Sequence, residues 1–136
     1  MTNTKSILLT ALILLECLPF VANAMSVSRM TCEKMVNPVV VSTNTPVFGW
    51  ELVSDLQGDY QKAYEICVSS DASLLADGKA DMWISGKVKS DQSQLVKYEG
   101  KSLLSGHKYF WSVKVWDSKG KMSSSGDIST FMIAPA

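Results

Sequence analysis

One segment, residues 103–120, constrains the fold more than any other part of the chain. It reads LLSGHKYFWSVKVWDSKG. Large apolar side chains occupy every second position from Tyr109 to Val115, which is the period of a β-strand with one buried face. The alternation predicts a long antiparallel strand whose core-facing row includes Trp111. It also places Phe110 and Trp116 on the opposite face of the same sheet.

Both ends of this strand carry specific turn chemistry. Ahead of it, Leu103 precedes Tyr109 by six residues with Gly106 between them, the spacing of a corner in which a tyrosine hydroxyl bonds to upstream backbone. Behind it, we expect the Asp117 side chain to cap a tight turn in which Gly120 takes a positive φ. These features are architectural, so they predict how the chain folds and say little about chemistry.

The rest of the chain also alternates between short strand-like segments and turn signals. A helix-tolerant stretch at residues 73–76 is cut short by Gly78, so we expect no long helix. We expect strands at residues 26–34, 47–52, 63–68, 83–88, 93–98 and 128–133, with a short apolar run at 39–42. Together with the strand that begins at Tyr109, this gives about seven strands. Such a pattern is typical of an all-β antiparallel sandwich of the immunoglobulin or fibronectin type III kind.

The first 24 residues have the composition of an export signal. Lys5 gives a positive start, residues 7–15 form an apolar run, and Ala22-Asn23-Ala24 is a small-x-small cleavage site. The run is too short for a membrane-spanning helix, which needs about 20 residues. We therefore expect a signal peptide at residues 1–24, a single module at residues 25–136, export to the periplasm or beyond, and no integral membrane association.

Two cysteines, Cys32 and Cys67, remain after the signal. In an oxidising compartment they could form a disulfide. Cys67 would behave equally well as a small apolar residue on a central strand. The sequence leaves both possibilities open, because a disulfide requires a short separation between the two Cα atoms.

Charge and motif content argue against most kinds of chemistry. The chain has 13 basic and 13 acidic residues without a polybasic stretch, which disfavours nucleic acid and anionic membranes as partners. His107 has no cysteine or carboxylate at metal-ligand spacing. The sequence contains no Gly-x-Ser-x-Gly elbow, glycine-rich phosphate loop or Cys-x-x-Cys pair. We therefore expect no catalytic residue, no metal site and no cofactor.

Five blocks of sequence, taken in order, resemble a known family. They are NP at 37–38, PVFGWEL at 46–52, QKAYEICV at 61–68, WISGKV at 83–88 with the serines and glutamine that follow, and the segment from Tyr98 to Gly120. Together they look like the N-terminal fibronectin III-like module of bacterial α-L-rhamnosidases of glycoside hydrolase family 78. The chain has Ile84 where that family usually has an aspartate, and Ser125 lies near a position where it usually has a tryptophan. The missing tryptophan predicts looser packing at the start of the last strand.

The resemblance implies a role without catalysis. In such enzymes, acidic residues on a large helical barrel far downstream hydrolyse terminal α-L-rhamnose. Inverting hydrolysis needs two carboxyl groups held about 6.5–9.5 Å apart, and nothing in this sequence marks such a pair. The resemblance thus implies an accessory module, with a structural or domain-docking role toward another domain or protein of a rhamnosidase-like system, and a chain that is a truncated or split piece of such an enzyme. The alternative is a free carbohydrate-binding module for rhamnose-containing glycans.

Four aromatic residues are the candidates for these two functions. Phe110 and Trp116 share the outward side of one strand and would form a docking surface, unless lysine stems or a loop cover them. Trp83 and Tyr98, or Trp116, would stack on a sugar ring in the alternative function. Packing at the edge of the core is the simpler explanation for Trp83 and Tyr98, because sugar recognition also needs a cluster of polar groups.

Overall fold

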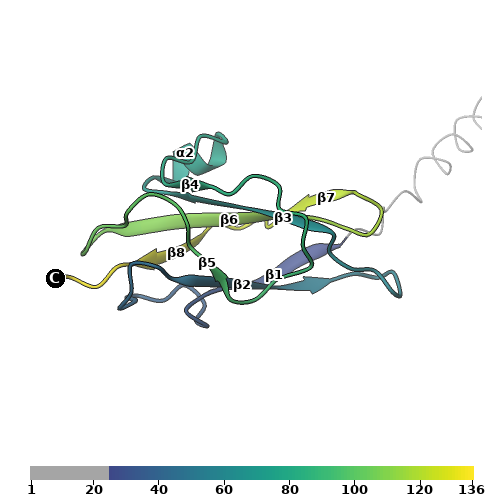
Figure 1. The fold of residues 1–136 in the computed structure, drawn as a ribbon, viewed down its shortest axis with the longest axis horizontal. Coiled ribbons are helices and arrows are strands. Elements are labelled where there is room, and N and C mark those ends of the chain that lie inside the picture. The colour runs from purple at the N-terminus through teal and green to yellow at the C-terminus, as the bar shows by residue number, and fades with distance from the viewer. Residues whose placement is uncertain (1–24) are drawn as a thin grey trace, which may run out of the picture.

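Two antiparallel sheets pack face to face in residues 25–136, the part of the chain that the computed structural model describes (Figure 1). Within that part, eight short strands and one short helix account for the regular structure. This confirms the all-β sandwich expected from the sequence. The predicted signal peptide at residues 1–24 lies outside the described residues.

The first sheet has three strands in the order β1-β2-β5. They are β1 (Ser26–Cys32), β2 (Val47–Val53) and β5 (Val96–Lys97). The register between β1 and β2 shifts between Ser28 and Thr31, where Arg29 has a positive φ. β1 ends earlier than the predicted 26–34, because Glu33 and Lys34 also take positive φ values, which extended backbone does not permit.

The second sheet is built around β6 (Lys108–Trp116), the strand predicted from residues 103–120. Its neighbours are β3 (Ala63–Ser69), which pairs with β4 (Trp83–Ile84), and on the other side β7 (Met122–Ser124) and β8 (Ser129–Met132). Both β7 and β8 pair with β6. The expected last strand at 128–133 is therefore the second of two pieces along the same side of β6, and the first piece was not predicted.

Two predicted strands are much shorter in the structure. Residues 83–88 and 93–98 contribute only β4 and β5, of two residues each. Gly86 and Leu95 have φ values of +71° and +57°, so the backbone leaves the extended region at both positions. The predicted helical turn is present as α2 (Ala72–Ala76), which contacts β3 and β6. Its N-cap is Asp71, whose side chain accepts a hydrogen bond from the Ser73 N–H.

The core lies between the sheets and is rich in aromatic side chains. Trp50 from the first sheet and Trp111 from the second are fully buried, as predicted. The rings of Phe48 and Trp111 meet across the sandwich with their centroids 4.6 Å apart. Burial of aromatic and branched apolar side chains is the main favourable term in the free energy of folding. The largest fully buried apolar residues are Trp50, Trp111, Phe48, Phe131, Ile66, Val68, Val113 and Val115.

One polar side chain, Gln61, is buried within this apolar region with only 2% of its surface exposed. Its Oε1 atom accepts a hydrogen bond from the Trp50 indole at 2.9 Å. Its Nε2 atom donates to the backbone carbonyls of Ser90 and Gln92, at 3.0 and 2.8 Å. Gln61 therefore ties the irregular segment between β4 and β5 to the core.

The corner and the turn that flank β6 are formed as predicted. The Tyr109 hydroxyl accepts a hydrogen bond from the Leu104 N–H at 2.9 Å. The Asp117 side chain accepts hydrogen bonds from two backbone N–H groups of the turn, at 2.9 and 2.8 Å, and Gly120 has a φ of +83°.

The two cysteines of the described part are free. Cys32 lies in the core on β1, and burial raises the pKa of its thiol to about 12. Cys67 lies opposite Ser112 on the outer face of the second sheet. The structure thus decides against a Cys32–Cys67 disulfide, because the Cys32 side chain faces the core and the Cys67 side chain points away from it.

Candidate functional site

Phe110 and Trp116, the predicted docking pair, are half-buried on the outer face of β6. Six residues of extended strand place them about 20 Å apart. Lys114 lies between them, and its Nζ atom is 3.7 Å from the Glu65 carboxylate. The helix α2 also packs on β6. The two rings therefore do not form the single apolar patch that the alternation of the strand suggested.

A lysine lies over each of these two rings. The Lys108 Nζ atom is 5.6 Å from the centroid of Phe110, and the Lys87 Nζ atom is 4.7 Å from the centroid of Trp116. These distances are typical of cation–π contacts. Coverage by lysine side chains, one of the two possibilities considered for these rings, is what the structure shows.

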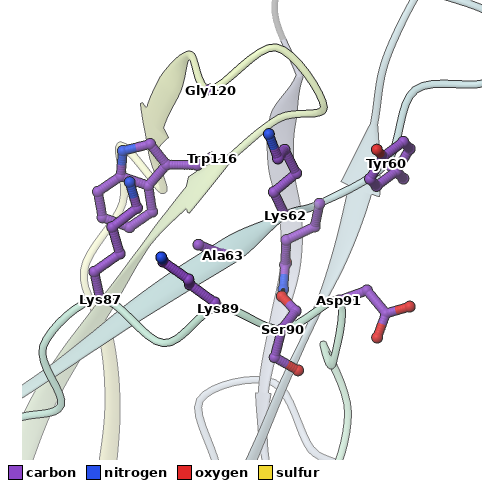
Figure 2. Close-up of a pocket in the computed structure, with 10 residues that line it drawn as sticks. Tyr60, Lys62, Ala63, Lys87, Lys89, Ser90, Asp91, Trp116 and Gly120 are labelled. Carbon is purple, nitrogen blue, oxygen red and sulfur yellow. The ribbon is translucent and has the colours of Figure 1, made fainter.

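The surroundings of Trp116 differ from those of Phe110, because Trp116 lines a groove of about 690 Å³ (Figure 2). We call it the lysine groove. Three lysines and one aspartate line it, with two aromatic rings near its ends. The lining residues are Tyr60, Gln61, Lys62, Ala63, Lys87, Lys89, Ser90, Asp91, Trp116 and Gly120. In the view of Figure 2, the side chains of Lys62 and Lys89 stand between Trp116 and Tyr60.

Backbone pairing positions the lysines of this groove. Val88 exchanges two hydrogen bonds with Tyr64 of β3, at 2.8 and 3.0 Å. Because side chains alternate along extended backbone, this pairing turns Lys87 and Lys89, on either side of Val88, away from the core. The Lys62 N–H donates to the Trp116 carbonyl at 2.7 Å, which places the backbone of the third lysine beside the end of β6.

The groove carries a net positive charge, since three lysines and a single aspartate, Asp91, are the charged residues that line it. Sequence reasoning identified Trp116 but missed the lysines. Lys62 is separated from Lys87 and Lys89 by the whole of β3, α2 and β4. Only the pairing of Val88 with β3 brings them together, and no local pattern reveals that pairing.

The other two candidates, Trp83 and Tyr98, pack against each other with ring centroids 5.3 Å apart. Tyr98 is only 4% exposed, and its hydroxyl donates to the Lys101 carbonyl. Burial raises its pKa to about 12. Tyr98 is therefore a core residue and not a glycan contact, in agreement with the simpler of the two explanations that its sequence position allowed. Gly100 permits this packing, because a Cβ atom there would lie 2.5 Å from the Tyr98 hydroxyl.

Trp83 is half-buried at the edge of the core, where its ring centroid lies 6.4 Å from that of Phe48. It also lines a hollow of about 350 Å³ together with Lys97 and Glu99. One part of the indole thus supports the core and another part faces this hollow. The two candidates do not form a flat platform, because the rings of Trp83 and Tyr98 meet edge to face at 74°.

Sequence reasoning also missed an exposed apolar loop at residues 35–40, which we call the valine loop. It contains Met35, Val36, Val39 and Val40, all of them exposed, and Val39 has 86% of its surface accessible. The loop leads directly into Val41, which is buried and pairs with the C-terminal segment: its N–H donates to Met132, and its carbonyl accepts from Ala134. The sequence signal for this loop is four valines within residues 36–41 that do not alternate as they would in a strand with one buried face.

Side chains that could bind a metal ion are dispersed over the rest of the described part. Residues 25–136 contain no cluster of three or more histidine, cysteine, aspartate or glutamate side chains suited to a metal ion. His107 is exposed in the corner before β6. None of the helices within the same residues has the length and apolar character needed to cross a membrane.

Comparisons with known proteins agree with this fold. Residues 27–135 match the family described as Rha78A-like, N-terminal immunoglobulin domain. An α-L-rhamnosidase of Formosa agariphila is 41% identical over 88 residues, which cover 65% of this chain and 9% of that enzyme. An α-L-rhamnosidase of Streptomyces avermitilis is 39% identical over 101 residues, which cover 74% of this chain and 10% of that enzyme.

Solved structures give the same result. The crystal structure of the Streptomyces avermitilis α-L-rhamnosidase complexed with L-rhamnose matches 82% of this chain, and 11% of its own, with a TM-score of 0.76 and 36% identity. The α-L-rhamnosidase of Dictyoglumus thermophilum matches 83% of this chain, and 13% of its own, with a TM-score of 0.78 and 35% identity. The chain spans about a tenth of the relatives that it matches. It belongs to the Rha78A-like N-terminal immunoglobulin domain family.

Proposed function

We propose that this chain is a noncatalytic accessory module of an α-L-rhamnosidase system, and that it docks through the valine loop onto the domain that follows such a module. The observation that carries the proposal is the position of Val39, which is 86% exposed and lies two residues before Val41, the residue that pairs with the C-terminal segment. This replaces the pair Phe110 and Trp116 as the docking surface, since those two rings are far apart on β6.

The relatives supply the first step. They are α-L-rhamnosidases about ten times as long as the matched region, and the family is described as their N-terminal immunoglobulin domain. In such proteins the following domain is therefore connected at the C-terminal end of the module. Here that end is held against Val41 by two backbone hydrogen bonds and pairs with it in parallel, so a polypeptide that continued past it would run beside residues 42–44, which directly follow Val41 and the valine loop.

The second step is energetic. Exposed apolar side chains that lie together mark interaction surfaces more often than isolated ones do. Transfer of one valine or methionine side chain from water to an apolar interface contributes about 1.5–3 kcal/mol when burial is complete. The four exposed side chains of the valine loop would thus stabilise a docked domain substantially, even if each were only partly covered.

A chimera tests the docking surface. Residues 25–136 replace the N-terminal module of the Streptomyces avermitilis α-L-rhamnosidase, and thermal unfolding is compared for Val39→Lys and Val53→Lys. Val53 is a matched control, because it is 52% exposed and lies at the end of β2 away from Val47 and the valine loop. We expect Val39→Lys alone to lower the unfolding temperature of the chimera, and neither substitution to change that of the isolated module. Equal effects of the two substitutions in the chimera would refute the docking surface.

The noncatalytic part of the proposal has its own assay. Purified residues 25–136 are incubated with an aryl α-L-rhamnoside, and release of the aryl group is followed by absorbance. We expect no release above the rate without protein. Turnover that persists through repurification would show an active site in this module and would overturn the proposal.

In the same proposal, residues 1–24 direct export, so that the module works in the periplasm or outside the cell. The support is the sequence of those residues alone, with its apolar run and its Ala22-Asn23-Ala24 site. Expression of the whole chain followed by mass spectrometry of the exported product tests this. A mature protein that still carries Met1 to Ala24 would contradict it.

A further inference from the structure

We propose that the lysine groove binds an acidic saccharide, one whose rings carry carboxylate or sulfate groups. This inference does not depend on the docking proposal, because the groove is built from the segment that leads into β3, the segment between β4 and β5, and the end of β6 with the turn after it. The valine loop contributes nothing to it.

Charge is the first argument. Lys62, Lys87 and Lys89 all line one groove, and Asp91 is the only acidic residue among its lining residues. The chain as a whole is electrically balanced, so this local excess of positive charge is not a property of the whole surface. Clefts lined by one sign of charge concentrate ligands of the opposite sign. The expected ligand is therefore an anion.

The aromatic rings give the second argument, because they indicate what the anion is attached to. Trp116 borders the groove, and the Lys87 Nζ atom stands 4.7 Å from the centroid of its ring. The ammonium group therefore lies over part of the indole, and the part of the half-buried ring that stays exposed adjoins this positive charge. An acidic sugar offers both complements, namely an apolar C–H face for the indole and a carboxylate or sulfate for the ammonium group. Tyr60 adds a second ring at the groove (Figure 2).

Rigidity of the groove is the third argument. Backbone hydrogen bonds hold Lys62 to Trp116 of β6 and Val88 to Tyr64 of β3. The Nε2 atom of buried Gln61 donates to the Ser90 carbonyl at 3.0 Å. A preorganised site loses less conformational entropy on binding than a flexible one. The groove volume of about 690 Å³ lies within the range of about 300–1,000 Å³ that is usual for small-molecule sites.

Size favours a saccharide over nucleic acid. A nucleic-acid site needs a long basic stripe that tracks many phosphates, and this groove offers three lysines. An acidic peptide would satisfy the lysines but has no need of the indole surface. These two occupants are outcomes of the test below.

The test is isothermal titration of residues 25–136 with hexagalacturonate and, separately, with a sulfated heparin hexasaccharide. Carboxyl-reduced hexagalacturonate has the same length without the charge, and poly-L-glutamate has the charge without sugar rings. We expect binding of at least one acidic hexasaccharide, weakened by raising the salt concentration from 50 to 500 mM because the charges are exposed. We expect no comparable binding of the reduced oligosaccharide or of poly-L-glutamate.

Variants connect the binding to the groove. Trp116→Ala should weaken it by about tenfold, as expected for loss of an aromatic contact, and Lys62→Gln, Lys87→Gln and Lys89→Gln by about two- to fivefold each. Phe110→Ala and Lys108→Gln are matched controls, since Lys108 stands over Phe110 on the same strand but outside the groove, and they should leave the affinity unchanged. Circular dichroism of each variant checks folding, and the three lysine variants change only exposed side chains.

Every other outcome overturns the proposal. Failure of both acidic hexasaccharides to bind means that the groove has no such ligand. Equal affinity for poly-L-glutamate or for a single-stranded oligonucleotide of similar charge means general attraction of polyanions. Binding that survives the lysine variants, or that is lost equally in the Phe110 and Lys108 controls, places the ligand elsewhere on the module.

Discussion

Replacing Gln61 by leucine should destabilise the module strongly, although the two side chains are similar in size. The Gln61 Oε1 atom is the hydrogen-bond acceptor for the indole N–H of Trp50, and Trp50 is fully buried. Leaving that N–H without a partner costs about 1–3 kcal/mol. Loss of the two hydrogen bonds to the carbonyls of Ser90 and Gln92 adds about 0.5–1.5 kcal/mol each, less where water reaches the carbonyl.

The leucine side chain offsets part of this loss, because it is more apolar than the amide, by about 1 kcal/mol. We therefore expect the free energy of unfolding to fall by about 2–4 kcal/mol, a large fraction of the roughly 5–15 kcal/mol usual for a domain. Urea titration of residues 25–136, followed by tryptophan fluorescence, measures it. Gln57→Leu, in the exposed loop before β3, is the matched control and should change the value by less than about 0.5 kcal/mol.

A double-mutant cycle separates the indole contact from the rest. In a Trp50→Phe background the indole N–H is absent, so Gln61→Leu should cost about 1 kcal/mol less than it does in the natural chain. If Gln61→Leu is as stable as Gln57→Leu, or if the cycle shows no coupling, then Gln61 does not tie the segment between β4 and β5 to the core.

Three further predictions concern single groups. Tyr109→Phe should lower the free energy of unfolding by about 0.5–1.5 kcal/mol, because the upstream backbone N–H loses its acceptor; an unchanged urea midpoint would contradict this. Hydrogen bonds from Ser118 and Ser54 lower the pKa of Asp59, so its contribution to stability is present above the unfolded-state pKa and is lost as the pH falls through the lower folded-state value. Asp59→Asn should accordingly flatten the decline of the urea midpoint on acidification below about pH 4, and an unaltered decline would count against it. In native protein at pH 8, iodoacetamide should label Cys67 before Cys32, whose pKa burial raises to about 12; mass spectrometry of peptides decides the order.

The features that the sequence predicted well are local ones. The alternation of β6 follows from side-chain geometry along a single strand, so burial of Trp111 and the corner at Tyr109 could be read from consecutive residues. The turn at Asp117 is local in the same sense. Each of these depends on fewer than about ten neighbouring positions, and no distant contact overrides them.

The features that were missed depend on contacts between distant segments. Leu95 takes a positive φ although it is not glycine, and nothing in its neighbourhood signals the resulting short β5. Tyr98 is buried against Phe48 and Trp83, which belong to other strands, and Gly100 leaves room for the close approach to residues 82 and 83. The lysine groove exists only because Val88 pairs with Tyr64, which brings Lys87 and Lys89 beside a residue far away in the chain.

The brevity of the outermost strands has a consequence for how the molecule behaves at high concentration. β4 and β5, which end one side of each sheet, have two residues each, and β1 on the opposite side of the first sheet is interrupted by a shift in register. A second chain would find no long row of unpaired N–H and C=O groups on which to add a strand. Fibre growth by lateral strand addition is thereby disfavoured at these three borders, without any need for protective charges along them.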